Sequence, residues 1–163
     1  MDNIKFTYLK QPLNKYTFKA PKIREWVESH CEGLTLNLFA GYIKLNINEI
    51  RNDLDNKAPT DFHLDAYDFV KGYRGIKFDT ILLDPPYSYR KSMELYENRR
   101  VSKFCLIADE IPKILSSKGI VITFGYHSVY EGKKRGFILE EILLIGHGGA
   151  QHDTIAIIER RIQ

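Results

Sequence analysis

The segment Phe78-Asp79-Thr80-Ile81-Leu82-Leu83-Asp84-Pro85-Pro86-Tyr87 decides the fold of this chain. Its first six residues form an apolar run with the length of a buried strand. The two prolines stop any strand or helix, because they lack a backbone N–H. Ligands of open α/β sheets bind beyond the carboxyl ends of such strands. We therefore expect Asp84, Pro85, Pro86 and Tyr87 to form a stiff loop of hydrogen-bond acceptors beside a flat ring, which suits an amino group on a planar ring.

The overall composition is that of a globular chain. Its 163 residues predict a single domain, 1–163, with residues 1–20 as an N-terminal arm. The net charge of +3 permits a polyanionic partner without demanding one. Cys31 and Cys105 predict no disulfide framework, and the N-terminus lacks the apolar core of a signal peptide. No stretch approaches the roughly 18 apolar residues of a membrane span, so we expect a cytoplasmic protein without a membrane partner.

Strand-like and helix-like segments alternate along the chain, which predicts an α/β fold with a mostly parallel sheet. A strand over 43–50 rests on the alternation of Ile43, Leu45 and Ile47 with polar residues. It follows Gly41 so closely that the first crossover helix must be short or absent. The other expected strands are 34–39, 62–66, 78–83 and 119–124, with a C-terminal antiparallel hairpin of 136–145 and 153–159, and the expected helices begin near residues 21, 67 and 102.

The loop Asp84-Pro85-Pro86-Tyr87 resembles the catalytic motif of amino-methyltransferases, which move a methyl group from S-adenosyl-L-methionine to an exocyclic or amide nitrogen. A rigid turn with a surface tyrosine is the alternative interpretation of four residues alone. The closing hairpin on a parallel sheet resembles the Rossmann-like class I methyltransferase fold, with one reversed edge strand. This resemblance covers roughly residues 17–161 and implies S-adenosyl-L-methionine as the cofactor.

Residues Leu36 to Gly41 look like the first motif of that family, a strand followed by a phenylalanine and a glycine turn. A glycine there lets the backbone approach the methionine part of the cofactor. The resemblance implies that Asn37, Phe39, Ala40 and Gly41 bind the cofactor. This chain departs from the family pattern twice, because Asn37 replaces the usual aspartate and Tyr42-Ile43 stands where a second glycine is expected.

Further cofactor contacts are implied at other strand ends. Glu49, at the end of the expected second strand, is the match for the acid that holds the ribose hydroxyls. Asp65-Ala66 matches the adenine-contacting position, although Asp65 can equally cap the helix that follows. Asp84 is expected to contact both the cofactor and the target. In Thr17–Pro21, which resembles the motif before the first strand, Lys19 or the nearby Lys22 is a candidate partner for the methionine carboxylate.

The family resemblance implies a nucleic-acid substrate. Asp-Pro-Pro-Tyr is associated mainly with adenine N6 methylation of DNA, which is the favoured activity, and also with guanine N2 methylation of RNA. An RNA base, at adenine N6 or guanine N2, is therefore an alternative. A catalytically inactive cofactor-binding subunit and a Rossmann-like binding protein of another class also remain open. The chain leaves little room for a target-recognition module, which favours a homodimer or a separate target-recognition subunit.

Basic residues in two loops are candidate phosphate contacts near the active face: Arg90, Lys91, Arg99 and Arg100 in the first, and Lys133-Lys134-Arg135 in the second. His127, His147 and His152 lack the spacing of metal ligands, so we expect no metal site. Methylation at carbon 5 of cytosine needs a nucleophilic cysteine, and neither cysteine follows a strand beside a proline.

Overall fold

The computed structural model describes residues 3–86, 104–126 and 131–162. Its strands form one seven-stranded sheet in the order β1-β6-β7-β5-β4-β2-β3. All neighbouring strands are parallel except β7, which runs antiparallel to β5 and to β6. The expected α/β class and mostly parallel sheet are confirmed. The strands are β1 (Lys5–Lys10), β2 (Thr35–Asn37), β3 (Glu49–Arg51), β4 (Phe78–Leu83), β5 (Leu115–Gly125), β6 (Phe137–Gly146) and β7 (Thr154–Arg161).

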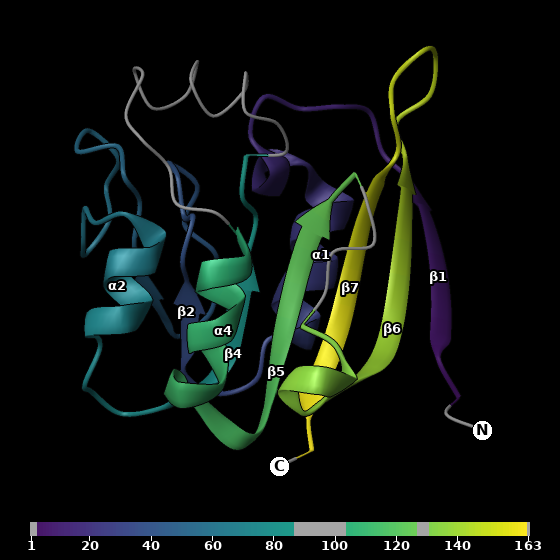
Figure 1. The fold of residues 1–163 in the computed structure, drawn as a ribbon. Coiled ribbons are helices and arrows are strands. Elements are labelled where there is room, and N and C mark those ends of the chain that lie inside the picture. Colours follow the sequence, from purple (N-terminus) through teal and green to yellow (C-terminus); the bar gives the residue numbers. More distant parts are fainter. Residues whose placement is uncertain (1–2, 87–103, 127–130, 163) are drawn as a thin grey trace.

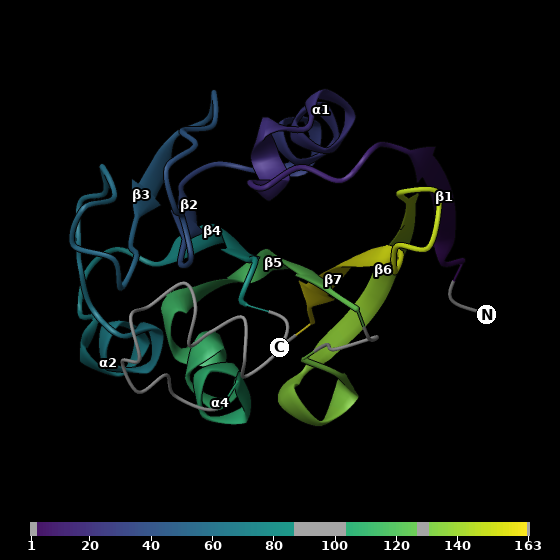
Figure 2. The same cartoon turned by 90° about the horizontal axis from the view of Figure 1, so that it is seen from above.

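Helices cover both faces of the sheet (Figures 1 and 2). Helix α1 (Pro21–His30) lies on one face, and α2 (Ala66–Gly72) and α4 (Phe104–Ile114) lie on the other. Two short 3-10 turns, η1 (Thr17–Lys19) and η2 (Lys133–Arg135), complete the described elements. Among the described helices, none is long and apolar enough to cross a membrane.

Strand β4 lies inside the sheet, between β5 and β2, and contributes to both layers of the core. Leu82 packs with the cluster under α1, whereas Ile81 and Leu83 pack with the cluster under α2 and α4. Alternate side chains of a strand point to opposite faces, so a strand buried on both faces is largely apolar. This explains Phe78, Ile81, Leu82 and Leu83, and the expected bounds 78–83 are confirmed. The side chains of Asp79 and Thr80 accept hydrogen bonds from the backbone N–H groups of Leu34 and Glu32.

The hairpin of β6 and β7 is confirmed as antiparallel, but the reversed strand is not at an edge. Strand β7 lies between β5 and β6. The N-terminal arm also differs from expectation, because its residues Lys5–Lys10 form the edge strand β1, parallel to β6. The buried Glu141 of β6 holds this edge, since its carboxylate accepts hydrogen bonds from Thr7 of β1 (2.9 Å) and from Trp26 of α1 (3.1 Å).

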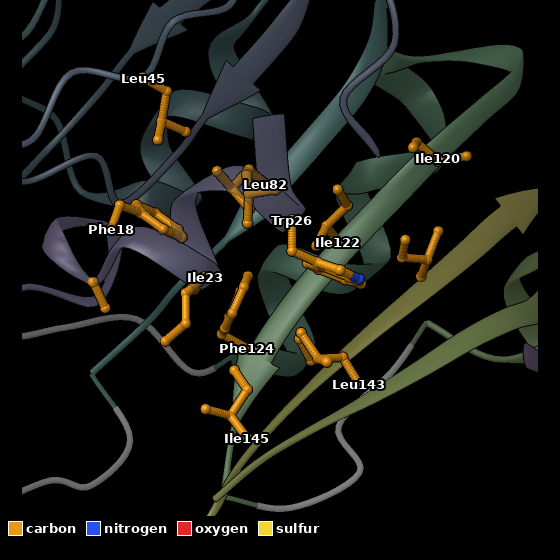
Figure 3. Packing of buried hydrophobic residues seen from close by; sticks show 14 residues of the cluster. Phe18, Ile23, Trp26, Leu45, Leu82, Ile120, Ile122, Phe124, Leu143 and Ile145 are labelled. Carbon is orange, nitrogen blue, oxygen red and sulfur yellow. The ribbon is translucent and has the colours of Figure 1, made fainter. Parts of the chain in front are cut away.

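The expected strand over 43–50 is wrong. Residues 42–48 form an irregular connection, and only Glu49–Arg51 pairs with the sheet, as β3. The apolar alternation has a different cause: Leu45 is 2% exposed, and Ile43 and Ile47 pack beside it against the core under α1. Figure 3 shows Leu45 near Phe18 and Leu82 on this face of the sheet. The connection from β2 to β3 therefore contains no helix, as expected, and its own apolar side chains cover the sheet instead.

The expected strand over 62–66 is also wrong, since it shrinks to a single bridge between Phe62 and Asn52. The Asn52 side chain replaces the missing ladder. Its amide donates to the carbonyl oxygens of Leu38 (3.2 Å) and Leu64 (3.0 Å), and its oxygen accepts from the N–H of Leu64. A side-chain amide can satisfy backbone groups in this way because it carries both donors and an acceptor.

Two buried carboxyl groups, those of Glu159 and Glu131, lie at the connection between β5 and β6, and the first of them anchors it. Glu159 of β7 accepts hydrogen bonds from the backbone N–H groups of Glu131 (2.6 Å) and Gly132 (2.9 Å). Within the described part of the chain, neither carboxylate oxygen of Glu131 has a hydrogen-bond partner. Burial raises the pKa of Glu131 to about 8; Arg135 opposes this rise and Glu159 adds to it. Glu131 is therefore mostly protonated at neutral pH.

Replacing Leu45 by alanine tests whether the connection between β2 and β3 supplies core packing. We expect a loss of about 2–5 kcal/mol in the free energy of unfolding, because a buried leucine leaves a cavity. Denaturant unfolding measures it. The matched control is Lys44→Ala, an exposed neighbour whose substitution should cost little. Equal stabilities of the two variants would show that the connection does not pack on the sheet.

Replacing Glu131 by glutamine tests the buried acid. An acid whose pKa is raised on folding stabilises the protein below its unfolded pKa, near 4.5, and that contribution is lost as the pH rises towards 8. At pH 8, Glu131→Gln should therefore have a free energy of unfolding higher than that of the wild type by roughly 1–3 kcal/mol, and a higher melting temperature. The gain at pH 5 should be smaller. Thermal melts across this pH range measure it, with the exposed Glu25→Gln as the control. A gain that does not depend on pH would contradict the assignment.

Candidate functional site

A cleft opens at the carboxyl ends of β2, β3 and β4, on the edge of the sheet that is uppermost in Figure 1. Four parts of the described chain line it: residues 15–18, residues 39–43, Asp53 with Asp55, and residues 84–86. Parallel strands present their carboxyl ends at one edge of a sheet, so loops far apart in sequence meet there. The cleft thus brings together six of the residues singled out from the sequence: Phe39, Ala40, Gly41, Asp84, Pro85 and Pro86.

The loop after β4 borders this cleft with Asp84, Pro85 and Pro86, all of them partly exposed. Strand β4 is firmly placed, since Ile81, Leu82 and Leu83 are fully buried. Neither proline carries a backbone N–H, so the two peptide groups after Asp84 offer acceptors and no donors. Tyr87, the fourth residue of the motif, lies outside the described residues.

The turn after β2 is held by Arg51 of β3 and by Asp53, which follows that strand. Gly41 has a positive φ of 56°, a conformation that favours glycine. Its N–H donates to a carboxylate oxygen of Asp53 (2.8 Å), and its carbonyl accepts from the guanidinium of Arg51 (3.0 Å). The same guanidinium reaches the carbonyl of Ala40 at 3.4 Å. Both backbone groups of the glycine are thus fixed from the end of β3.

Asp53 is the acidic residue at the carboxyl end of β3, a position that the sequence analysis assigned to Glu49. It is buried, and burial raises the pKa of its carboxyl. The assignment to Glu49 followed from the misplaced strand: Glu49 is the first residue of β3 and does not line the cleft. The signal that would have found Asp53 is the acidic segment Asp53-Leu54-Asp55, which directly follows Ile50-Arg51-Asn52.

Asn37 is buried and lies beside Glu49 rather than in the cleft. Its amide donates to one Glu49 oxygen (3.1 Å), while the other oxygen accepts from the Leu45 N–H and lies 3.3 Å from the Arg51 guanidinium. An aspartate at position 37 would set two buried carboxylates against each other. The departure from the family's usual aspartate therefore has a local cause, namely the carboxylate of Glu49.

The remaining residues predicted to bind the cofactor do not line the described cleft. Asp65 caps α2 by accepting from the N–H of Tyr67 (3.0 Å), and Ala66 is buried in the core under that helix. Lys22 donates to the carbonyl of Lys10 (3.1 Å), away from the cleft. The lysine that lines the cleft is Lys15.

The basic segment Lys133–Arg135 is not near the cleft, which corrects the expectation from the sequence. It forms η2, ahead of the start of β6, at the opposite edge of the sheet (Figure 1). Arg135 there pairs with Asp109 of α4 at 2.8 Å. The other basic candidates, Arg90, Lys91, Arg99 and Arg100, lie outside the described residues.

Of the three histidines considered as metal ligands, two make contacts within the fold. The His147 ring contacts the Gln11 carbonyl and the Thr154 hydroxyl, both at 2.8 Å, and His152 lies beside Tyr126. His127 lies outside the described residues. Within the described ranges, no group of three His, Cys, Asp or Glu side chains is placed to hold a metal ion.

The described lining of the cleft carries an excess of negative charge. Asp53, Asp55 and Asp84 face it, against the single cation of Lys15. A concave surface of one sign raises the local concentration of ligands of the opposite sign. The cleft therefore suits a ligand with a positive centre.

Several solved structures share the architecture of this chain. The chain superposes on the candidate methyltransferase yhhF of Escherichia coli with a TM-score of 0.59 and 13% identity, covering 93% of this chain and 90% of that one. The present chain therefore has the class I methyltransferase fold. SMU.776, a candidate methyltransferase solved with S-adenosylhomocysteine, matches with a TM-score of 0.59 and 14% identity over 85% of this chain and 48% of that one.

A candidate rRNA methylase of Clostridium thermocellum matches this fold with a TM-score of 0.50 and 10% identity over 91% of this chain and 98% of that one. No protein-family model and no curated protein sequence matches the chain. The resemblance is therefore one of backbone architecture, and the chemistry must be argued from the side chains of the cleft.

Changing Asn37 to aspartate tests whether the nearby Glu49 carboxylate excludes the aspartate that the family usually has at this position. We expect a loss of about 1–3 kcal/mol at pH 7, because the new carboxylate faces Glu49 without a compensating donor. The repulsion raises the pKa of one carboxyl of the pair, so the lost stability should return as the pH falls towards 4. Thermal melts at several pH values measure this. Asn48→Asp, at an exposed asparagine, is the control, and a variant as stable as that control at pH 7 would rule out the conflict.

Proposed function

We propose that this protein is an S-adenosyl-L-methionine-dependent methyltransferase that modifies an exocyclic amino group of a nucleic-acid base, with adenine N6 of DNA as the favoured target. One observation carries the proposal. The loop Asp84-Pro85-Pro86 borders the same cleft as the Phe39-Ala40-Gly41 turn, although more than 40 residues separate them in sequence. A cofactor held by the turn and a target held by the loop would therefore meet.

The side chains of the cleft fit this cofactor. Its positively charged sulfonium centre matches the excess of carboxylates in the described lining. Asp53, which follows β3 and lines the cleft, is the proposed acceptor of hydrogen bonds from the ribose hydroxyls. Gly41, with its missing side chain and fixed backbone, allows close approach of the methionine part. When bound, the cofactor supplies an electrophilic methyl group.

The Asp84 loop suits the other reactant. An aromatic amine is a weak nucleophile because its lone pair is delocalised into the ring. Its two N–H groups can donate to the Asp84 carboxylate and to a carbonyl of the donor-free proline segment, which favours a tetrahedral nitrogen with an available lone pair. As the new C–N bond would form, the carbon–sulfur bond of the sulfonium would break and S-adenosylhomocysteine would leave. The nitrogen would then become acidic, and Asp84 is the proposed acceptor of its proton. Tyr87 is the candidate stacking surface for the base, which must be flipped or unpaired to enter.

Two alternatives are favoured by particular observations. RNA as the substrate is favoured by the structural likeness to the candidate rRNA methylase. A cofactor-binding subunit without activity is favoured by the departures at Asn37 and Tyr42 from the family's first motif. For either substrate, a second copy or a separate recognition subunit is the proposed means of target selection.

Incubation with cofactor carrying a deuterated methyl group, followed by mass spectrometry of digested nucleosides, separates these candidates. Double-stranded DNA, single-stranded DNA and total RNA are offered in parallel. Labelled N6-methyladenine from DNA is the expected product. A labelled base from RNA alone would replace DNA as the substrate, and cofactor binding without transfer to any of the three would favour the inactive subunit.

Asp84→Ala tests the catalytic assignment. We expect methyl transfer to fall by at least about 100-fold, since the residue both orients the amine and accepts its proton. Affinity for S-adenosylhomocysteine, measured by calorimetry, should change by less than about threefold, because the fixed glycine turn is untouched. Asp68→Ala, an exposed aspartate on α2, serves as the control. Retention of full activity by Asp84→Ala would remove Asp84 from the mechanism.

A further inference from the structure

The cofactor cleft of this protein lacks a helix on one side. Residues 38–48 join β2 to β3 without any helical turn, although they carry Phe39, Ala40 and Gly41 of the cleft wall. A helix would fix such a turn through its own backbone hydrogen bonds. The shape of this wall must therefore be fixed by contacts with other parts of the chain.

Tyr42 makes such a contact at the outer side of the turn. Its hydroxyl donates to a carboxylate oxygen of Asp55 at 2.6 Å, across the mouth of the cleft that both residues line. This hydrogen bond raises the pKa of the Tyr42 hydroxyl to about 12, so it stays a donor at neutral pH. Tyr42 is 42% exposed as a residue, so its packing in the core is limited.

The Tyr42–Asp55 hydrogen bond completes a cyclic hydrogen-bond network at this wall of the cleft. Asp53 accepts from the N–H of Gly41 through one oxygen (2.8 Å) and from the N–H of Asp55 through the other (2.9 Å). Asp55 in turn accepts from Tyr42, the covalent neighbour of Gly41. This hydrogen-bond network thus joins the turn after β2 to the segment after β3. It includes both Gly41 and Asp53, the glycine and the acid assigned to the cofactor.

The N-terminal arm rests on the same side chain. The ring of Tyr16 lies 5.9 Å from that of Tyr42, and the ammonium of Lys15 lies 5.2 Å from the centre of the Tyr16 ring. Both residues line the cleft. Tyr42 therefore contacts both the arm and the segment after β3.

We propose that Tyr42 and Asp55 are positioning residues for the S-adenosyl cofactor, whose hydrogen bond holds Gly41 and Asp53 in their binding geometry in place of a crossover helix. The inference rests on the proposed function. It also gives a role to Tyr42, which stands where the family pattern has no aromatic residue. Neither residue needs to touch the reacting atoms.

A double-mutant cycle on the full chain tests this. Tyr42→Phe removes the hydroxyl and keeps the ring against Tyr16, and Asp55→Ala removes the acceptor. Calorimetry with S-adenosylmethionine and S-adenosylhomocysteine should show roughly tenfold weaker binding for each single variant, and no further loss in the double variant. Tyr8→Phe, an exposed tyrosine on β1 outside the cleft, is the matched control and should bind as the wild type does.

Three readouts separate positioning from mere stability. The melting temperature of Tyr42→Phe without ligand should match that of Tyr8→Phe, whereas the stabilisation by added S-adenosylhomocysteine should shrink. In methyl transfer, the KM for the cofactor should rise while kcat at saturation stays near the wild-type value.

Tyr42→Phe binding within twofold of the wild type, or losses in the double variant that simply multiply, would overturn the inference and leave the proposed function standing. A wild-type protein that binds neither ligand would overturn the proposed function, and this inference would fall with it.

Discussion

The absence of a helix between two neighbouring parallel strands is the constraint on which the rest of this structure depends. Strands β2 and β3 are joined by residues 38–48 alone. Those residues must cover a sheet face, turn the chain back and form one wall of the cleft. Leu45 meets the first demand, and the backbone of Gly41 meets the last. A crossover helix would hold this turn by its own backbone hydrogen bonds. Here side chains of β3 and of the segment after it hold the turn instead.

Buried polar groups carry this arrangement. Arg51 binds the carbonyls of the glycine turn, Glu49 pairs with Arg51 and Asn37, and Asn52 ties the ends of β2 and of the 62–64 segment together. Buried polar groups cost free energy unless they are paired, so such a network specifies one geometry strongly. The same network decides which acid faces the cleft: Glu49 is used within the fold, and Asp53 is presented at its edge.

The charge of the described cleft lining suits one of the two proposed ligands, the cofactor, better than the other, a nucleic acid. Its described lining is acidic, which suits a cationic ligand, whereas a nucleic acid needs positive charge near its phosphates. The basic segment Lys133–Arg135 lies at the opposite edge of the sheet and is partly paired with Asp109. Within the described residues Lys15 is the cation of the cleft lining, and the sequence carries further basic residues after Tyr87, outside the described ranges.

By itself, the sequence determined the α/β class, the buried strand over 78–83, the C-terminal hairpin and the acceptor loop that follows this strand. These features follow from local rules, since an apolar run long enough for a strand and two successive prolines leave few alternatives. The tertiary structure alone decided the roles of residues 42–55. Alternating apolar residues look the same whether a segment joins a sheet or packs across its face, so β3 was misplaced and Glu49 was chosen instead of Asp53. Which carboxylate reaches a cleft depends on strand register, and register is set by pairing with β2, a contact between distant residues that no local pattern records.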